Sequence, residues 1–253
     1  MSSIDASSGK RIKVIVPIPM DHAGIANRRA QLRDGDVASG YEVEFVAVDN
    51  GAALGDSYYD AALMDWYVLR AGLQAEQEGY DAVCIDTVSD SGLYALRSRL
   101  NIPVLGPGQT SFHLACTLGQ KFSVVTMWPQ WYHLYTKLFD QYHLWDRVAS
   151  LRSIDTRPDL RDLLAGKEEV IFEALERECL EAIEADGADV IVLGSTTMHQ
   201  SHAYLSSRLP VPVINPGLAA YKMAEVVLEM GLSHSKIAFP TPEMPRDQAV
   251  LAT

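Results

Sequence analysis

Cysteine is scarce in this chain, and long apolar runs are absent. The 253 residues include Cys84, Cys116 and Cys179, whose spacing fits neither a zinc site nor a disulfide framework. We expect all three thiols to lie in the core, because free cysteines are commonly buried. No apolar stretch is long enough to cross a bilayer, and the first residues lack the apolar segment of a signal peptide. The sequence therefore predicts a cytoplasmic protein that does not act at a membrane.

Positive charge is also in short supply. Lys and Arg number 21 against 33 Asp and Glu, which gives a formal net charge of −12, and no basic run offers contacts to phosphates. These features exclude a general nucleic-acid binder. They leave an anionic small-molecule substrate open, because the local field of a pocket can oppose the net charge. A hydrophobic content of 48% with 21% charged residues is ordinary for a globular protein with a substantial core.

Two segments of the chain repeat each other. Residues 79–108 and 187–217 each contain a short apolar run, a small hydroxylated cluster, a helical pattern and a second apolar run that leads to Pro-Gly. Asp81 matches Asp189, and Thr87 matches Ser195. Self-similarity of this length predicts two equivalent structural halves. Short apolar runs are typical of buried parallel strands, and ligands of open α/β sheets bind at the carboxyl ends of such strands. Thr87 and Ser195 are therefore expected to face each other across a cleft.

Strands and helices alternate along the sequence, which predicts parallel sheets covered by helices. Apolar and alternating patterns predict strands at 12–18, 41–48, 82–85, 122–127, 148–154 and 190–193. Helical spacing predicts helices at 22–33, 60–78, 111–118, 131–142, 168–186 and 218–230, and the tail from residue 239 is expected to be extended or loosely docked. We predict an α/β fold with two pseudo-symmetric lobes and an active site in the cleft between them. The first lobe would contain residues 1–110 and a returning C-terminal helix within 216–253, and the second residues 111–215.

Four segments give the chain a resemblance to a known family. They are E-G-Y-D-A-V-C-I-D-T-V-S-D-S-G-L, I-P-V-L-G-P-G, K-F-S-V-V-T-M and D-G-A-D-V-I-V-L-G-S-T-T-M. Their order and spacing resemble the aspartate/glutamate/hydantoin racemase superfamily, most closely its hydantoin and allantoin racemase branch, from about residue 12 to residue 232. The resemblance implies two α/β lobes, an active site between them and no metal or organic cofactor. It also implies two cysteines, one in each lobe, that act as acid and base on opposite faces of the substrate carbon.

The residues that carry this chemistry in the family differ here. In T-V-S-D-S-G, Thr87 stands where the family has its first cysteine, and in G-S-T-T-M, Ser195 stands where it has its second. The substrate-holding N-P-N motif is replaced by I-P-M at residues 18–20. A thiol titrates near neutrality, whereas an alcohol holds its proton tightly and is a weak base without an activator. The sequence therefore predicts the family's fold with a reaction that does not use a thiol pair.

Two hydroxyl-rich strand ends are the first candidates for the site. Each leads into a helix, where free backbone N–H groups and the helix dipole suit a carboxylate or an enolate oxygen. The alternative is that these residues are ordinary helix N-caps, for which Ser and Thr are favoured. The two clusters are Thr87, Val88 and Ser89, and Ser195, Thr196 and Thr197.

Acidic residues near these clusters are candidates for acid–base chemistry. Asp86 and Asp90 flank the first cluster, and either could act as a general base if the cleft raised its pKa. Asp90 could equally cap the following helix. Asp21 follows the first strand, where the family's substrate-holding loop lies, and could be a site residue or part of a turn. Tyr58 matches a family segment that has a tyrosine beside the site.

Histidine supplies the remaining candidate. His199 follows Ser195 and could assist it by hydrogen bonding or proton transfer. His199 and His202 have a spacing that suits a metal, but no third ligand is evident, so we expect no metal. We predict catalysis by Thr87, Ser195, His199 and Asp86, and substrate binding by Asp21, Tyr58, Val88, Ser89, Asp90, Thr196 and Thr197.

The leading functional hypothesis is a cofactor-independent enzyme that isomerises or racemises a small carboxylate or a hydantoin-like cyclic amide. One alternative is a lyase such as a decarboxylase, or a ring-opening hydrolase in which Ser195, activated by His199, attacks a carbonyl. Another alternative is a non-catalytic binder of small anions. In each case the partner is a small molecule, and we expect the protein to be a homo-oligomer.

Overall fold

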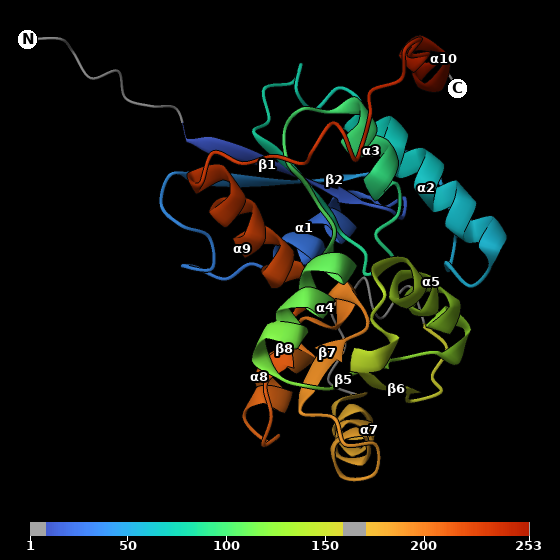
Figure 1. Ribbon diagram of the computed structural model, residues 1–253, viewed down its shortest axis with the longest axis vertical. Coiled ribbons are helices and arrows are strands. Elements are labelled where there is room, and N and C mark those ends of the chain that lie inside the picture. Colours follow the sequence, from blue (N-terminus) through green and yellow to red (C-terminus); the bar gives the residue numbers. More distant parts are fainter. Residues whose placement is uncertain (1–8, 159–170, 253) are drawn as a thin grey trace, which may run out of the picture.

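Two four-stranded parallel sheets form the framework of the protein (Figure 1). The computed structural model describes residues 9–158 and 171–252. The first sheet has the order β2 (Tyr41–Ala47), β1 (Lys10–Val16), β3 (Ala82–Ile85) and β4 (Val104–Leu105). The second has the order β6 (Val148–Ser153), β5 (Phe122–Thr126), β7 (Val190–Leu193) and β8 (Val213–Ile214). Both sheets thus share one topology, and the predicted α/β fold with two equivalent halves is confirmed.

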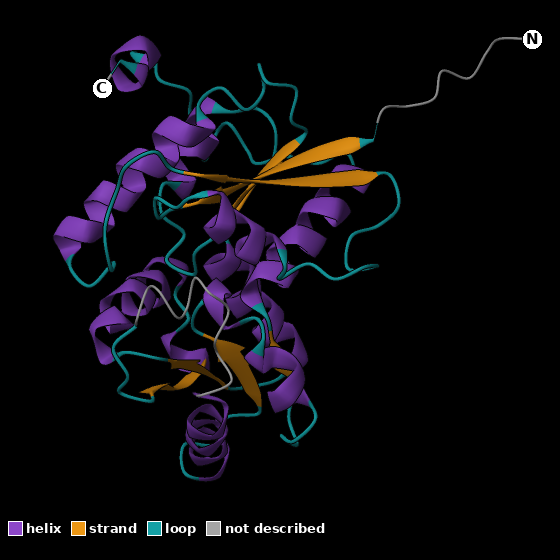
Figure 2. Ribbon diagram, turned by 180° about the vertical axis from the view of Figure 1, so that it is seen from behind, coloured by secondary structure: helices purple, strands orange, loops and turns teal. Residues whose placement is uncertain are grey.

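Helices flank each sheet, and the two sheets lie at opposite ends of the molecule (Figure 2). The α-helices are α1 (His22–Arg29), α2 (Tyr58–Gly72), α3 (Leu93–Arg99), α4 (Pro107–Leu118), α5 (Tyr132–Tyr142), α7 (Phe172–Glu184), α8 (Ser201–Ser206), α9 (Pro216–Glu229) and α10 (Asp247–Leu251). Short 3-10 turns are η1 (Pro129–Trp131), η2 (Trp145–Arg147) and η4 (Thr196–Met198). Helix α9 comes after the second sheet in the chain but packs against β3 and β4 of the first, beside α4.

The central strands explain why the sequence folds in this way. All four residues of β3, A-V-C-I, and all four of β7, V-I-V-L, are buried. Parallel strands covered on both faces have such continuous apolar runs, because neither face meets water. In the first sheet, Val83 and Ile85 pack with Leu96 of α3, whereas Cys84 packs with Tyr221 of α9 on the other face. Successive side chains of one strand therefore join two separate cores.

Several helix boundaries differ from the sequence prediction. Helix α1 ends at Arg29, four residues before the predicted end, because the chain then turns at residues 33–36, where the Asp36 carboxylate accepts from the Arg33 N–H. Helix α4 begins at Pro107 instead of residue 111. The tail, expected to be extended or loosely docked, contains the short helix α10, which an ion pair between Arg99 and Asp247 holds against the first half. The start of the helix predicted over 168–186 lies outside the described residues, and α7 begins at Phe172.

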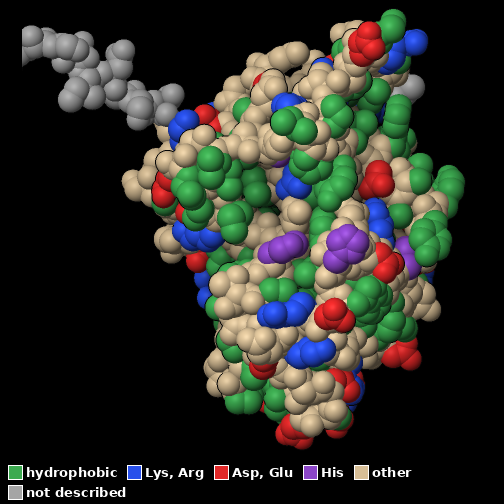
Figure 3. Space-filling view, viewed as in Figure 1, with side chains coloured by type: hydrophobic (Ala, Val, Ile, Leu, Met, Phe, Trp, Pro, Cys, Tyr) green, Lys and Arg blue, Asp and Glu red, His purple; other side chains and the backbone are tan. Residues whose placement is uncertain are grey.

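Helix α9 carries the exposed apolar side chains Met223 and Val226, and the exposed Met230 directly follows it. Figure 3 shows apolar side chains gathered over this helix. Within the described ranges, no helix combines the length and the apolar character that crossing a bilayer requires.

Candidate active site

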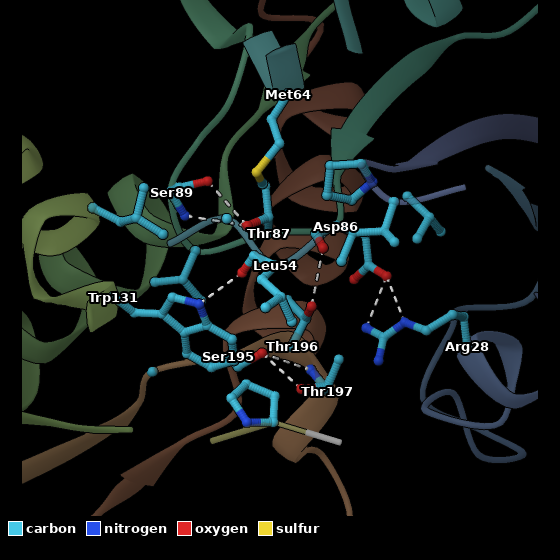
Figure 4. A pocket seen from close by; sticks show the side chains of 18 of the residues that line it. Arg28, Leu54, Met64, Asp86, Thr87, Ser89, Trp131, Ser195, Thr196 and Thr197 are labelled. Atoms are coloured by element: carbon cyan, nitrogen blue, oxygen red, sulfur yellow. Dashed lines mark hydrogen bonds and ion pairs between the residues drawn. The ribbon is translucent and has the colours of Figure 1, made fainter. Parts of the chain in front are cut away.

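A cavity lies between the carboxyl ends of the two sheets (Figure 4). Residues directly after β3, from Asp86 to Ser89, line one part of it, and residues directly after β7, from Gly194 to Thr197, line another. Thr87 and Ser195 thus reach the same cavity from opposite halves of the protein. This is the juxtaposition that the sequence repeat predicts.

The two hydroxyl clusters fold in the same way. In the first hydroxyl loop (Thr87–Ser89), Thr87 Oγ1 and Ser89 Oγ are 3.0 Å apart, and the Ser89 N–H donates to Thr87 Oγ1 at 3.4 Å. In the second hydroxyl loop (Ser195–Thr197), Ser195 Oγ and Thr197 Oγ1 are 2.7 Å apart, and the Thr197 N–H donates to Ser195 Oγ at 3.2 Å. A hydroxyl that accepts from the N–H two residues later is the local turn that Ser and Thr favour.

The capping alternative applies to only one of the loops. Ser195 is the N-cap of η4, since its side chain accepts from the Thr197 N–H. Helix α3 begins instead after Gly92, which provides no side-chain cap. Thr87 and Ser89 therefore do not cap the helix that comes after them. Ser89 Oγ bonds to Ser91 Oγ at 2.8 Å, which extends the first row of hydroxyls into the interior.

One hydrogen bond joins the two loops. Thr196 Oγ1 donates to the backbone carbonyl of Asp86 at 3.0 Å, and both residues are buried. Thr196 therefore fixes the second loop to the end of β3, immediately before Thr87. The separation of the two loops depends on this contact.

The Asp86 carboxylate is occupied by other protein groups. Arg28 Nε and Nη2 each lie 2.8 Å from Asp86 Oδ2, and the two side chains are 4% and 0% exposed. Tyr221 OH and Gln31 Nε2 donate to Asp86 Oδ1 at 3.3 and 3.4 Å. The carboxylate is directed at Arg28 (Figure 4), which compensates its charge, and the catalytic role of Asp86 remains a sequence-based prediction.

The Asp90 carboxylate makes its hydrogen bonds outside the cavity. It does not line the cavity, and its carboxylate accepts the N–H groups of Gly108 and Gln109 at the start of α4. The alternative that Asp90 caps the following helix is wrong, because α3 has Gly92 at its N-cap and the Asp90 side chain bonds to the first turn of α4 instead. Burial raises the pKa of Asp90 to about 6, while the N–H donors oppose this shift.

Three further candidates also lie outside the residues that line the cavity. Burial and the positive charge of Arg28 lower the pKa of His199 to about 4, so its imidazole is neutral at pH 7. Asp21 caps α1 by accepting from the Gly24 N–H at 2.9 Å. Tyr58 is 78% exposed, and its ring contacts that of His133 with centroids 5.1 Å apart. Their proposed roles at the site remain sequence-based predictions.

An apolar wall completes the cavity, and the sequence did not reveal most of it. Ile18 and Met20 line it together with Leu54, Met64 and Trp131. Trp131 Nε1 donates to the Leu54 carbonyl at 2.8 Å, which connects the two halves at the rim. The helical pattern of 131–142 gives no sign that Trp131 reaches a cavity. Its place shortly after β5, equivalent to the loop after β1, is the signal that could have identified it.

The cysteines do not line the cavity. Cys84 and Cys179 are buried as predicted, and burial raises the pKa of both thiols, that of Cys179 to about 12. Cys116 is only partly buried, which corrects the prediction that all three are core residues. Among the residues described, no group of three or more His, Cys, Asp or Glu side chains is placed to hold a metal ion.

Comparison with known proteins agrees with this architecture. The family model described as Asp/Glu/Hydantoin racemase matches residues 26–224. A hydantoin racemase of Pseudomonas sp. (strain NS671) is 33% identical over 231 residues, which cover 90% of this chain and 89% of that protein. A hydantoin racemase of Paenarthrobacter aurescens is 28% identical over 227 residues, with 89% and 94% covered. Among solved structures, allantoin racemase from Klebsiella pneumoniae has a TM-score of 0.84 at 29% identity and covers 96% of this chain and 99% of its own.

Proposed function

Because the chain belongs to the Asp/Glu/hydantoin racemase family, we propose that it exchanges the proton on the carbon beside a carbonyl of a hydantoin-like cyclic amide. The reaction would use neither a thiol pair nor a cofactor, because Thr87 and Ser195 stand where the sequence resemblance places the family's two cysteines, and no cysteine is among the described residues lining the cavity. The observation that carries the proposal is the pair of matching hydroxyl loops that line one cavity from opposite halves.

The loops provide hydrogen-bond donors for the intermediate of such a reaction. Loss of a proton from the ring carbon places negative charge on the neighbouring carbonyl oxygen. Hydroxyl groups fixed before the reaction stabilise this enolate, because they need not reorganise as the charge develops. The proton leaves to cavity water, and return of a proton to the opposite face of the carbon inverts its configuration. Atoms and charge balance, since one proton passes from the carbon to water and one solvent proton returns to the enolate.

The apolar wall supports a substrate with an apolar substituent. Ile18, Met20 and Met64 offer methyl and thioether groups, and Trp131 offers a ring edge beside the loops. A substituent on the exchanging carbon would pack there, while the ring carbonyls face the hydroxyls. Pockets of this composition bind mainly through apolar contact and use a few polar groups for orientation.

Exchange in heavy water tests the proposal. Enantiopure 5-benzylhydantoin should incorporate deuterium at C5 and lose optical activity at equal rates, with the ring intact, as followed by proton NMR and chiral chromatography. The spontaneous rate without enzyme is the baseline, and a Thr87→Val/Ser195→Ala variant is the control. Ring opening to the N-carbamoyl amino acid would establish the hydrolase instead. Saturable binding without exchange or conversion would establish a non-catalytic binding protein.

A second candidate is decarboxylation. The observation that supports it concerns Asp86, which is the one carboxylate among the described residues lining the cavity and is bound to Arg28. A reaction that needs no general base is therefore favoured. Loss of CO₂ from a substituted malonate produces an enolate without a general base, and the hydroxyl loops would stabilise the same charge. Release of CO₂ from phenylmalonate, with no exchange of the hydantoin, would favour this function.

A further inference from the structure

Asp90 connects the first hydroxyl loop to the helices of the second half. It is the residue directly after Ser89, and its Oδ1 accepts the Gly108 N–H at 2.8 Å. Its Oδ2 accepts the Gln109 N–H at 2.7 Å and the Tyr142 hydroxyl at 3.1 Å. These donors lie in the first turn of α4, which packs against β7, and in α5. One carboxylate therefore connects the segment after β3 to α4 and α5.

The surrounding backbone is shaped to receive this carboxylate. A Cβ at Gly106 would clash with Asp90 Oδ1, and a Cβ at Gly108 would clash with the Val88 carbonyl oxygen. Asp90 itself has a φ of 52°, a left-handed conformation that Asp adopts more readily than most residues. Glycine at both positions allows α4 to approach within direct contact of the first hydroxyl loop.

The equivalent position in the second repeat is not titratable. Counted along the repeat, Met198 corresponds to Asp90, and its side chain is buried in an apolar cluster. The second hydroxyl loop therefore has no counterpart of the Asp90 carboxylate, and the titratable side chain beside it is His199, whose ring is hydrogen-bonded to the Thr196 backbone. A change in the protonation of Asp90 would act on one loop only.

The environment of Asp90 sets where it titrates. Burial raises its pKa to about 6, against the effect of the two N–H donors, the Tyr142 hydroxyl and the Arg97 charge. Tyr94 and Arg97 approach from α3, Asp65 from α2, and Lys137 and Tyr142 from α5. A protonated Oδ2 has to donate, so it accepts poorly from the Gln109 N–H. The contact with α4 then weakens.

We propose that Asp90 is a positioning residue whose ionised carboxylate holds the first hydroxyl loop opposite the second, so that its protonation lowers the rate of proton exchange while the protein stays folded. The activity part of this inference rests on the proposed function, whereas the structural part does not. Asp90 touches no reacting atom; it acts through Ser89 and Thr87.

The sign of the effect on stability separates positioning from unfolding. The pKa of Asp90 in the folded protein lies above the ordinary value of 3.8. Between these two values the folded state binds more protons than the unfolded state, so this group adds to the free energy of unfolding as the pH falls. A loss of activity near pH 6 that arises from Asp90 is therefore not accompanied by destabilisation from Asp90.

The first experiment uses the ligand-free protein. Proton–nitrogen NMR spectra between pH 7.5 and 4.5 should show the amides of Gly108, Gln109 and Ser89 titrating with one midpoint near 6, and Asp90→Asn should abolish it. Asp189→Asn is the matched control, because Asp189 also accepts backbone N–H groups, from Gln120 and Lys121, far from the cavity. A midpoint confined to Gly108 and Gln109, with Ser89 unaffected, would overturn the proposal. The wild-type titration alone decides this if Asp90→Asn does not fold.

The second experiment measures the rate of 5-benzylhydantoin exchange. Below the midpoint, kcat should fall about tenfold per pH unit with little change in KM, as expected when one ionised group is required. Asp90→Asn should have a low kcat that no longer depends on pH in this range, and Asp189→Asn should keep the wild-type profile. A wild-type profile in Asp90→Asn would overturn the proposal. Absence of exchange at every pH would contradict the proposed function, while the NMR titration would still test the position of the loop.

Discussion

The two hydroxyl loops are alike where they face the cavity and different behind it. Both place a hydroxyl at the strand end and pair it with another two residues later. Behind the first loop, Asp86 bonds to Arg28 and Asp90 to the start of α4. Behind the second, the Tyr135 hydroxyl donates to the Gly194 carbonyl at 2.6 Å. The two copies of the repeat therefore have the same arrangement toward the cavity but different supporting contacts behind it.

Packing explains why the second loop has no counterpart of Asp86. A Cβ at Gly194 would lie 2.6 Å from Thr126 Cβ and 2.9 Å from the Tyr135 hydroxyl. The space that a carboxylate would need is filled by the tyrosine, whose hydroxyl also lies 2.9 Å from Thr126 Oγ1. Carboxylates therefore support the first loop, whereas the Tyr135 hydroxyl and the His199 imidazole, which is neutral at pH 7, lie behind the second. Mutation of each support tests this difference.

Removing the ionic support should be the most damaging change. Arg28→Met leaves Asp86 buried without its charge partner, and such a loss costs about 3–5 kcal/mol. Tyr135→Phe leaves one carbonyl without its donor, which costs about 1–3 kcal/mol. Urea unfolding at pH 7 measures both. Equal losses of unfolding free energy in the two variants would contradict the difference between the ionic support of the first loop and the hydrogen-bonded support of the second.

Changes within the loops should affect the reaction and spare the fold. Thr87→Val and Ser195→Ala each remove one hydroxyl donor, and each should lower 5-benzylhydantoin exchange by about 10²–10³. Ser206→Ala, at an exposed serine of α8, should have no effect. If only Ser195→Ala lowered the rate, the loops would not be equivalent. Near-complete loss in Ser195→Ala alone would favour a covalent role for Ser195.

Protonation of His199, which is buried near the positive charge of Arg28, should lower the free energy of unfolding. In the folded protein its pKa is about 4, below the ordinary 6.5, so the unfolded state takes up the proton first. The free energy of unfolding should therefore fall between pH 6.5 and 4, by roughly 2–3 kcal/mol from this group. Urea unfolding of His199→Gln should show a smaller fall over this range. His22→Gln, at an exposed histidine, should behave as wild type, and an unchanged slope in His199→Gln would contradict the assignment.

Local sequence was sufficient to predict the sheets and the position of the loops. The apolar runs of β3 and β7 dictate buried parallel strands, and chain connectivity places the next residues at the carboxyl end of each strand. The repeat then related Thr87 to Ser195 without any knowledge of the tertiary structure. These inferences depend on neighbours in the sequence, which the sequence displays directly.

The direction of each polar side chain could not be predicted in the same way. Asp86 turns to Arg28, a residue of α1 that is distant in the sequence, and Asp90 turns to α4 instead of the cavity. A buried carboxylate goes to whichever donors the tertiary fold presents, and those donors come from other elements. Trp131 reaches the cavity through the placement of η1, which no local pattern specifies.

Chemical modification of the thiols is expected to have the smallest effect on the rate of exchange. The experiment tests whether the reaction depends on the hydroxyl loops and not on a thiol. Burial raises the pKa of Cys84 and Cys179, so neither forms much reactive thiolate at pH 8. Cys116 is partly buried, and its pKa is also raised, although the nearby Arg147 charge opposes this. Iodoacetamide should therefore label Cys116 slowly in the folded protein, and all three cysteines in urea, as counted by mass spectrometry. Exchange of 5-benzylhydantoin should continue at its original rate after Cys116 is labelled, and Cys116→Ser should remove the native label without loss of rate. Rapid inactivation by iodoacetamide, with protection by the hydantoin, would place a thiol at the reacting carbon. The two hydroxyl loops would then not be the basis of the chemistry.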